Sequence, residues 1–480
     1  MSAAQEALRI GSKKFTESVI LGEIVRLVFE SEGISAEHQR ELGGTRILFS
    51  GTETGQLDVY PEYTGTIRFE ILATDSPASD DASRALLAQR GLSVSTPLGF
   101  SNNYGIAVPR SLADELKLET ISDLQEHPQL RIGFNHEFLE RADGWPGLRD
   151  LYGLPQHRVV GIDHDLAYRA LGAGDLDVME VYTTDAEISY YDLRVLLDDR
   201  GYFNQYEAVL LYRAALEEQP AFRAALARLA GSIDEATIGE LNASVKFGDE
   251  TETSAAARFV ATLGIEAAAE SEDTRLGRIA RYTLQHLTLV GLSMAAAIIV
   301  AIPVGVVASK LPGLGWLVIG GTGVIQTIPS LALLVLMLPL LGIGDAPAIS
   351  ALFLYSLLPI VRNTHAGLAA IPPSTEEVAD ALDLGFWTRL LRIELPLASR
   401  SIAAGVKTAA VLNIGFATLG AIVGSGGYGA PILTGIRLNR IDLILEGAIP
   451  AALLALAAQG LLGLAERAVV PRGLRLRRDG

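Results

Sequence analysis

The 480-residue sequence has no cysteine and only 7 histidines. The absence of cysteine excludes disulfides, thiolate metal sites and a cysteine nucleophile. The histidines are scattered, and the run HEFLE that begins at His136 lacks the second histidine of a metalloprotease helix. No Gly-x-x-x-x-Gly-Lys-Ser/Thr run is present to cradle the phosphates of ATP. We therefore expect no metal or other cofactor on this chain, and no ATP hydrolysis by it.

Charge is scarce in the second half of the chain. Residues 275–480 hold 16 Lys/Arg and 10 Asp/Glu, a net charge of +6, so that residues 1–274 hold 23 and 46, a net charge of −23. A helix needs about 20 mostly apolar residues to cross a bilayer. The second half offers long stretches without a single charged residue, at 282–309, 311–344, 346–361, 408–436 and 447–465. This half is predicted to be a membrane domain, and the acidic first half disfavours nucleic-acid binding.

The uncharged stretches predict five spans, at about 284–308, 316–341, 347–370, 401–424 and 443–468. The second is long enough to contain a break, which we expect at Pro329. Lys and Arg near span ends mark the cytoplasmic side. With five spans, one group of basic residues falls on the cytoplasmic side: Lys310, Arg389, Arg392, Arg400 and the basic tail 471–480. The amino-terminal half then lies outside. Arg275, Arg278 and Arg281 argue for the opposite orientation.

Residues 7–262 alternate between strand-like and helix-like patterns. Strands are expected at 8–11, 58–60, 105–108, 131–134, 177–180, 194–197 and 208–211, with a helix at about 18–31. This alternation predicts parallel sheets covered by helices, with ligands bound beyond the carboxyl ends of the strands. Residues 266–281 are predicted to link this globular part to the membrane domain.

One short segment between two predicted spans resembles a known motif. The run EVADALD at 377–383 is followed by Ile393, Glu394, Leu395 and Pro396. This is similar to the cytoplasmic coupling loop of binding-protein-dependent ABC importer permeases, in which Glu-Ala-Ala-x-x-x-Gly precedes Ile-x-Leu-Pro. Val378 replaces an alanine, and Asp383 replaces the glycine that enters positive φ at no cost. The resemblance implies a short helix, with Glu377, Ala379 and Asp383, that docks on a moving ATPase subunit.

Other motifs resemble one branch of these importers, the osmoprotectant systems. QTIPSLA at 326–332 and LPIVRNT at 358–364 look like their permeases. GSKKFTE at 11–17, DVYPEYTGT at 58–66, NNY at 102–104 and VYTTD at 181–185 look like their binding proteins. The implied fold is a two-lobed α/β domain of the type II periplasmic-binding-protein kind, followed by an all-α type I permease. We expect a binding domain at 1–265, with lobe 1 at 7–104 and 206–262 and lobe 2 at 105–205, and a permease at 282–470.

By this resemblance, four tyrosines would form an aromatic cage for a quaternary ammonium group: Tyr63, Tyr104, Tyr182 and Tyr206. Arg141, Lys13 and Thr66 would hold a carboxylate on the same ligand. Alternatives stay open at this point. Tyr60 and Tyr202 are the substitutes within the cage, Lys13 could lie exposed beside Lys14, and Arg141 could pair with Glu137 on its own helix. Arg141 would favour ligands with a carboxylate, because choline would leave its charge uncompensated.

The sequence therefore predicts the fused binding-protein and permease subunit of an ATP-driven importer for a quaternary amine such as glycine betaine. Choline, carnitine and ergothioneine are alternative substrates. The expected partners are a separate ATPase homodimer that binds ATP and Mg²⁺, a second copy of the permease, and the lipid bilayer. A ligand-gated channel or sensor without an ATPase is the alternative from a different class. The first residues show no basic segment followed by an apolar one, so no export signal is predicted within this sequence.

Overall fold

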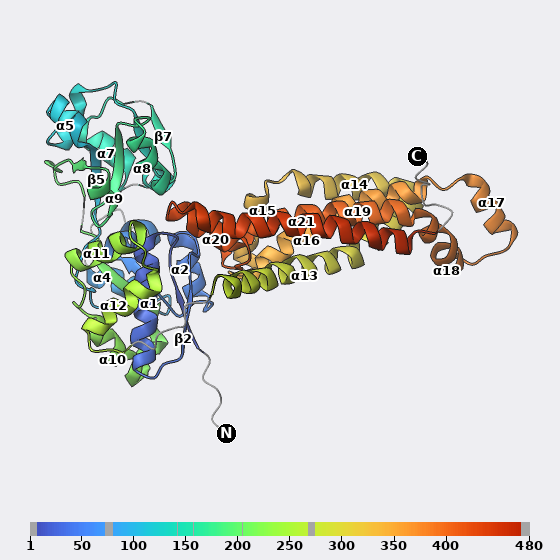
Figure 1. Cartoon of the computed structure of the whole chain (residues 1–480), viewed down its shortest axis with the longest axis horizontal. Helices are drawn as coiled ribbons and strands as arrows, with labels where there is room; N and C mark the ends of the chain where they lie inside the picture. The colour runs from blue at the N-terminus through green and yellow to red at the C-terminus, as the bar shows by residue number, and fades with distance from the viewer. Residues whose placement is uncertain are drawn as a thin grey trace. The chain divides into compact units, whose positions relative to one another are not determined.

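The computed structural model describes residues 7–72, 80–141, 143–156, 158–203, 205–266 and 274–471. The chain divides into two compact units, residues 1–269 and residues 270–480, and Figure 1 traces both in chain order. The first unit contains two five-stranded sheets, and the second is helical. The predicted α/β fold followed by an all-α fold is therefore confirmed.

The first sheet has the strand order β2-β1-β3-β10-β4 and forms lobe 1. Its strands are β1 (Leu8–Gly11), β2 (Ala36–Gln39), β3 (Val59–Tyr63), β4 (Leu92–Val94) and β10 (Ala208–Arg213). The second sheet, of lobe 2, has the order β7-β6-β8-β5-β9. Its strands are β5 (Tyr104–Pro109), β6 (Ile132–Phe134), β7 (Val159–Gly161), β8 (Val178–Tyr182) and β9 (Leu193–Val195). All seven predicted strands are present, and β2, β4 and β7 were missed.

The sheets are mixed, so the prediction of purely parallel sheets is wrong. Strand β10 runs antiparallel to β3 and β4, and β5 runs antiparallel to β8 and β9, while β1–β2, β1–β3, β6–β7 and β6–β8 are parallel. Parallel neighbours need a crossover connection of a dozen or more residues. Strands β5 and β10 instead follow directly on the segments that pass between the lobes, so each enters its sheet against the direction of its neighbours.

Two segments connect the lobes, one between β4 and β5 and one between β9 and β10. They meet in an antiparallel bridge between Ser101 and Glu207. Beside it, the backbone N–H of Asn102 donates to the carbonyl of Tyr206 at 2.9 Å. We call this pair of segments the hinge. Its bridging residues lie close to the lobe boundaries expected from the sequence, at 104/105 and 205/206.

Helix α1 (Thr16–Ser31) is the central helix of lobe 1, with residues 16–29 buried. A helix that is enclosed on all sides needs partners all round, and α1 packs against α10 (Pro220–Leu229), α11 (Glu235–Lys246) and α12 (Glu252–Thr262). The other helices of this unit are α2 (Thr45–Glu53), α3 (Thr64–Thr66), η1 (Ile67–Ile71), α4 (Asp80–Ala88), α5 (Arg110–Leu116), η2 (Ile121–Glu126), α6 (His136–Glu140), α7 (Trp145–Tyr152), α8 (His164–Gly172), α9 (Glu187–Tyr190) and η3 (Ala214–Glu218).

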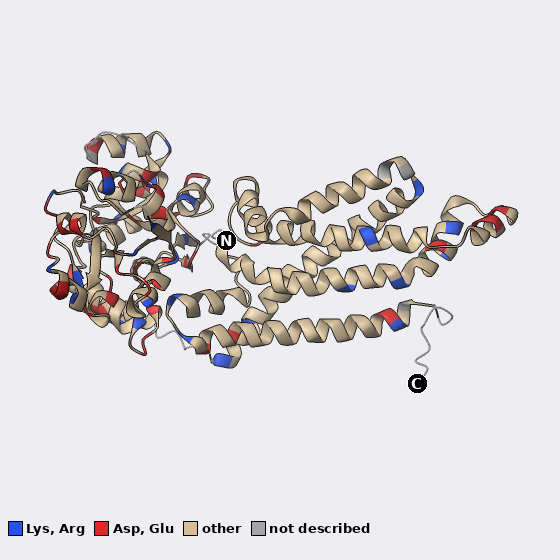
Figure 2. Cartoon of the chain, turned by 90° about the horizontal axis from the view of Figure 1, so that it is seen from above, with Lys and Arg blue, Asp and Glu red and all other residues tan. Residues whose placement is uncertain are grey.

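The second unit contains four helices that are long and apolar enough to span a membrane, or five spans with one bent pair, within its described residues. They lie within α13 (Arg275–Lys310), α16 (Asp345–Ala369), the stretch from α18 (Phe386–Arg389) through α19 (Leu395–Phe416) to η5 (Ala417–Val423), and α21 (Ile441–Val469). The bent pair is α14 (Pro312–Thr327) and α15 (Ser330–Leu341), which meet at 96° beside Pro329, as predicted. In Figure 2, charged residues of this unit gather near the helix ends.

The boundaries differ from the expected ones in three places. Residues 275–281, which the sequence places in a linker, are the first turns of α13. Helix α19 begins six residues earlier than expected, directly after the short π-helix η4 (Leu390–Glu394). Helix α20 (Gly429–Arg437) was not predicted and follows a turn in which Gly424, Gly426 and Gly427 all have positive φ. Most of the basic tail lies outside the described residues.

Candidate functional site

Five aromatic rings form a continuous row between the lobes of the first unit. Tyr63 lies 6.3 Å from Phe15, and Phe15 lies 5.9 Å from Tyr182, measured between ring centroids. Tyr182 lies 5.3 Å from Tyr104, which lies 5.6 Å from Tyr206 in an edge-to-face arrangement. The structure thus brings together all four tyrosines of the predicted cage. It adds Phe15, which the sequence analysis quoted within a motif but gave no role.

The sheets and the hinge position these rings. Tyr104 begins β5 and faces Tyr182, the last residue of β8, across an antiparallel pair. Tyr63 ends β3 of lobe 1, and Tyr206 lies in the hinge. Gly65 makes room for Tyr206, because a Cβ atom there would lie 2.2 Å from the tyrosine ring. Both lobes and the hinge therefore contribute to the row.

Arg141 lies at the row but is already paired with two carboxylates. Its Nε and Nη2 donate to the two oxygens of Asp143 at 2.8 and 2.6 Å, and Nη1 donates to Glu70 of lobe 1 at 2.9 Å. The guanidinium also lies 5.8 Å from the centre of the Tyr104 ring. Among the described residues, the alternative partner Glu137 forms neither a hydrogen bond nor an ion pair with Arg141. Tyr206 completes the cluster by donating its hydroxyl to Asp143 at 2.5 Å.

Lys13 is buried, so the alternative that it lies exposed beside Lys14 is wrong. Its ammonium donates to Glu62 at 2.5 Å and lies 5.5 Å from the centre of the Tyr63 ring. Lys14 is exposed and pairs instead with Asp163 of lobe 2 at 3.4 Å. Thr66 is buried at the end of α3. Lys13 follows strand β1 and Thr66 follows strand β3, so both lie within lobe 1.

The two substitute tyrosines are not members of this row of five rings. Tyr60 is fully buried within β3. Tyr202 donates its hydroxyl to the carbonyl of Gly144 at 2.7 Å. The ring of Tyr202 contacts that of Phe203, which lies 6.3 Å from the ring of Tyr104.

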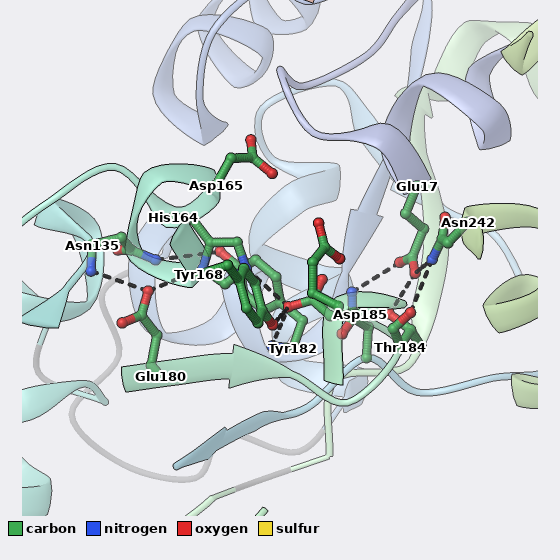
Figure 3. A network of polar contacts seen from close by, with 12 residues as sticks. Glu17, Asn135, His164, Asp165, Tyr168, Glu180, Tyr182, Thr184, Asp185 and Asn242 are labelled. Carbon is green, nitrogen blue, oxygen red and sulfur yellow. Dashed lines mark hydrogen bonds and ion pairs between the residues drawn. The ribbon is translucent and has the colours of Figure 1, made fainter. Parts of the chain in front are cut away.

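Glu17, at the start of α1, is a buried carboxylate that the sequence analysis did not single out. It accepts hydrogen bonds from Tyr63 (2.5 Å), Asn102 (2.9 Å), Thr184 (2.5 Å) and Asn242 (3.1 Å). These donors come from lobe 1, the hinge and lobe 2 (Figure 3 shows Asn242 and Thr184 beside Glu17). Burial raises the pKa of Glu17, against the effect of its four hydrogen-bond donors. A single side chain thus joins the cage to both lobes.

His164, at the start of α8, supports Tyr182 in the middle of the row. Its Nδ1 lies 3.1 Å from Glu180 and its Nε2 lies 2.9 Å from Asp185, and its ring lies 4.5 Å from that of Tyr182 (Figure 3). The same Asp185 oxygen accepts the backbone N–H of Tyr182. Because carboxylate oxygens only accept hydrogen bonds, both ring nitrogens must donate, and the imidazole is charged.

The second unit contains the short helix expected from the sequence between two spans. We refer to residues 373–396 as the coupling segment. Helix α17 (Pro373–Ala381) is short, with Ala379 buried and Glu377 exposed. Asp383 follows it with φ of 49°, the left-handed conformation that glycine adopts without strain and that Asp tolerates better than most residues. The departure from the motif is thus accommodated by the backbone. Leu395 and Pro396 begin α19.

Arg389 and Glu394 hold this segment in shape. Arg389 pairs with Glu376 at 2.9 Å, with Asp380 at 2.8 Å and with Glu394 at 2.7 Å. Glu394 is buried and also accepts from Lys310, the last residue of α13, at 2.7 Å. The coupling segment is therefore tied both to itself and to the end of the first span.

Comparisons with known proteins match both units of the chain. Residues 6–262 match the family described as the substrate binding domain of ABC-type glycine betaine transport systems, and residues 297–472 match the inner membrane component of binding-protein-dependent transport systems. The chain belongs to both families. It is therefore a binding-protein and permease fusion of an ABC import system, and a multi-pass inner membrane protein.

Separate permeases are similar to the second half of this fusion. The osmoprotectant import permease OsmW of Salmonella typhimurium is 42% identical over 204 residues, which cover 42% of this chain and 95% of the relative. The glycine betaine/carnitine/choline permease OpuCB of Bacillus subtilis is 38% identical over 201 residues, or 42% of this chain and 93% of the relative.

A solved structure described as a glycine betaine/carnitine/choline ABC transporter is 26% identical and covers 54% of this chain and 99% of its own, with a TM-score of 0.47.

The charge on His164 gives the binding domain of the fusion a testable pH dependence. Burial acts to lower the pKa of His164, but Asp185 and Glu180 outweigh it and hold the pKa well above the ordinary value of 6.5. A raised folded-state pKa stabilises the fold below the ordinary value, and this stability is lost as the pH rises through the folded-state pKa. At neutral pH, His164→Gln should cost about 3–5 kcal/mol, because it leaves two buried carboxylates without their cation.

Calorimetric unfolding of the full chain in detergent measures this effect. The difference in melting temperature between wild type and His164→Gln should shrink as the pH is raised above neutrality. A difference that stays constant with pH would contradict a charged His164.

Proposed function

We propose that this fusion imports a quaternary-ammonium solute such as glycine betaine, and that a separate ATPase subunit supplies the energy. The observation that carries the proposal is the row of five aromatic rings contributed by both lobes and the hinge. A quaternary ammonium group has no N–H to donate, so hydrogen bonds cannot select it. Aromatic faces can, at about 0.5–2 kcal/mol for each ring. Closing the lobes around such a ligand would complete the cage.

The carboxylate of a betaine would lie near Arg141, Lys13 and Thr66. Arg141 has five N–H donors, of which three are used by Asp143 and Glu70. Two remain for a ligand carboxylate. The same pairing also changes the argument against choline, because the charge of Arg141 is compensated without a ligand. Glycine betaine, choline, carnitine and ergothioneine all remain candidates.

The coupling segment would dock on an ATPase homodimer, which would bind ATP and Mg²⁺, while this chain binds no cofactor. Support comes from exposed apolar side chains on this segment, which a water-exposed loop rarely gathers: Val378, Leu382, Phe386, Trp387 and Leu391. A permease with one sequence would pair with a second copy of itself, giving two binding domains for each transporter.

We propose that the binding domain lies outside the cell and that the coupling segment and the carboxyl-terminal tail lie in the cytoplasm. The basic residues that oppose this orientation are partly neutralised. Arg278 and Arg275 at the start of α13 pair with the buried Glu446 of α21, at 3.1 and 3.5 Å. The charge asymmetry counts Lys and Arg rather than net charge, so the proposed orientation rests on those that it places in the cytoplasm: Lys310, Arg389, Arg392, Arg400 and the four arginines of the tail.

Calorimetric titration of the full chain in detergent tests the proposed substrate class. Glycine betaine, choline and carnitine share a trimethylammonium group and should include at least one ligand with micromolar or tighter affinity. Glycine, which has the carboxylate but not the methyl groups, serves as the control and should not bind. Binding of glycine alone, or of none of the three, would refute the proposal.

A further inference from the structure

A cavity opens between the lobes beside the aromatic row, and its polar wall has no role in the proposed cage. Phe15 and Tyr182 belong both to the row and to the cavity wall. The remaining wall comes from α1, the hinge, lobe 2 and α11, and includes Glu17, Asn102, Glu187 and Asn242. A ligand held in the cage would therefore have this cavity next to it.

Three buried oxygen atoms in this wall lack a hydrogen-bond partner within the described part of the chain. They are Oδ1 of Asn102, Oδ1 of Asn242 and Oε2 of Glu187, on residues that are 7%, 4% and 6% exposed. The orientation of Asn242 is fixed, because its amide nitrogen donates to Glu17 and to the carbonyl of Thr184, both at 3.1 Å. Asn102 is fixed in the same way by its bond to Glu17. In both cases the acceptor oxygen must point away from Glu17.

Buried acceptors without a donor are costly, so this wall is suited to a group that donates hydrogen bonds. The charges agree. Four carboxylates line the cavity (Glu17, Asp165, Asp185 and Glu187), against one lysine and one histidine (Lys246 and His164). A ligand carboxylate would be repelled here, whereas a hydroxyl would satisfy one of the free oxygens.

We propose that this cavity is a donor-accepting subsite that takes the hydroxyl of a quaternary-ammonium ligand such as choline, with the trimethylammonium group in the cage. Asn102 and Asn242 are the specificity-determining residues of this subsite. The inference rests on the proposed function. It goes beyond that function by dividing the site into an aromatic part, which accepts any trimethylammonium ligand, and a polar part, which rewards a hydroxyl.

A pair of ligands tests the subsite in the wild-type protein. Choline and n-propyltrimethylammonium have nearly the same shape, but a methyl group replaces the hydroxyl in the second. A site built to bond a hydroxyl discriminates strongly against an analogue that lacks it. Calorimetric titration of the full chain in detergent should show choline binding at least tenfold more tightly than its isostere. Equal binding would mean that water alone fills the cavity, and would overturn the inference while leaving the cage intact.

Two variants locate the effect. Asn242→Leu removes one free oxygen and should reduce the preference for choline to within about threefold. Thr184→Val is the matched control, because Thr184 bonds the same Glu17 from lobe 2 but contributes no free oxygen to the cavity. It should weaken both ligands equally and keep their ratio. An unchanged ratio in both Asn242→Leu and Asn102→Leu would overturn the assignment. Failure of every ligand to bind wild type would instead refute the proposed function.

Discussion

Replacing Tyr104 with leucine is expected to lower the affinity for every trimethylammonium ligand at least tenfold. Tyr104 lies in the row between Tyr182 and Tyr206: its ring contacts Tyr182 at 5.3 Å, Tyr206 at 5.6 Å and Phe138 at 5.0 Å. Leucine fills much of the same volume without an aromatic face, so the loss reflects cation–π attraction and the alignment of its neighbours rather than a cavity. Titration of the full chain with choline and glycine betaine measures the loss.

Tyr104→Phe is the matched control for this result. It keeps the ring, so affinity should remain within about threefold of wild type. Comparable melting temperatures for the two variants would show that both fold. Should leucine and phenylalanine weaken binding to the same degree, the aromatic cage would not be the basis of recognition.

Replacing Trp387 with glutamate is expected to reduce ATP-driven uptake at least tenfold while ligand affinity stays at the wild-type level. Trp387 is 68% exposed in α18 (Phe386–Arg389), beside Phe386, which is 54% exposed. A charge in the middle of this apolar patch would have to be desolvated on docking, which is costly for an unpaired group. Uptake and copurification of the ATPase subunit measure the effect.

Ser374→Glu provides the same charge on the same segment as a control. Ser374 is exposed in the first turn of α17, 13 residues before Trp387, where an acidic residue suits the helix. This variant should transport normally. If Trp387→Glu transports as well as Ser374→Glu, or also loses ligand binding, then the coupling segment does not have the proposed role.

The parts of the fold that depend on local pattern could be predicted from the sequence. Long uncharged stretches and the position of Pro329 gave the spans and the bend, because hydrophobic length and a missing N–H act within a few residues. Strands with continuous apolar runs were found. The missed β2, β4 and β7 are edge strands of three or four residues, and they carry too short a pattern to identify.

The parts of the site that depend on long-range pairing could not be predicted. Resemblance located the four tyrosines, but the bond between Glu17 and Asn242 joins residues 225 positions apart. The alternative that Arg141 pairs with Glu137 rested on helical spacing, whereas the end of α6 turns the side chain toward Asp143 and Glu70. Phe15 stands two residues after Lys13 in the motif GSKKFTE, and an aromatic residue so close to a predicted ligand-binding residue was the one signal that could have revealed it.

ATP-driven uptake by the reconstituted fusion tests the central claim most directly. The full chain and its ATPase subunit would be incorporated into liposomes, with radiolabelled choline or glycine betaine outside and no other binding protein added. Our account predicts that the label accumulates only when the ATPase is supplied with ATP and Mg²⁺. Uptake that requires an added binding protein, or that equilibrates the label at the same rate without ATP, would contradict it.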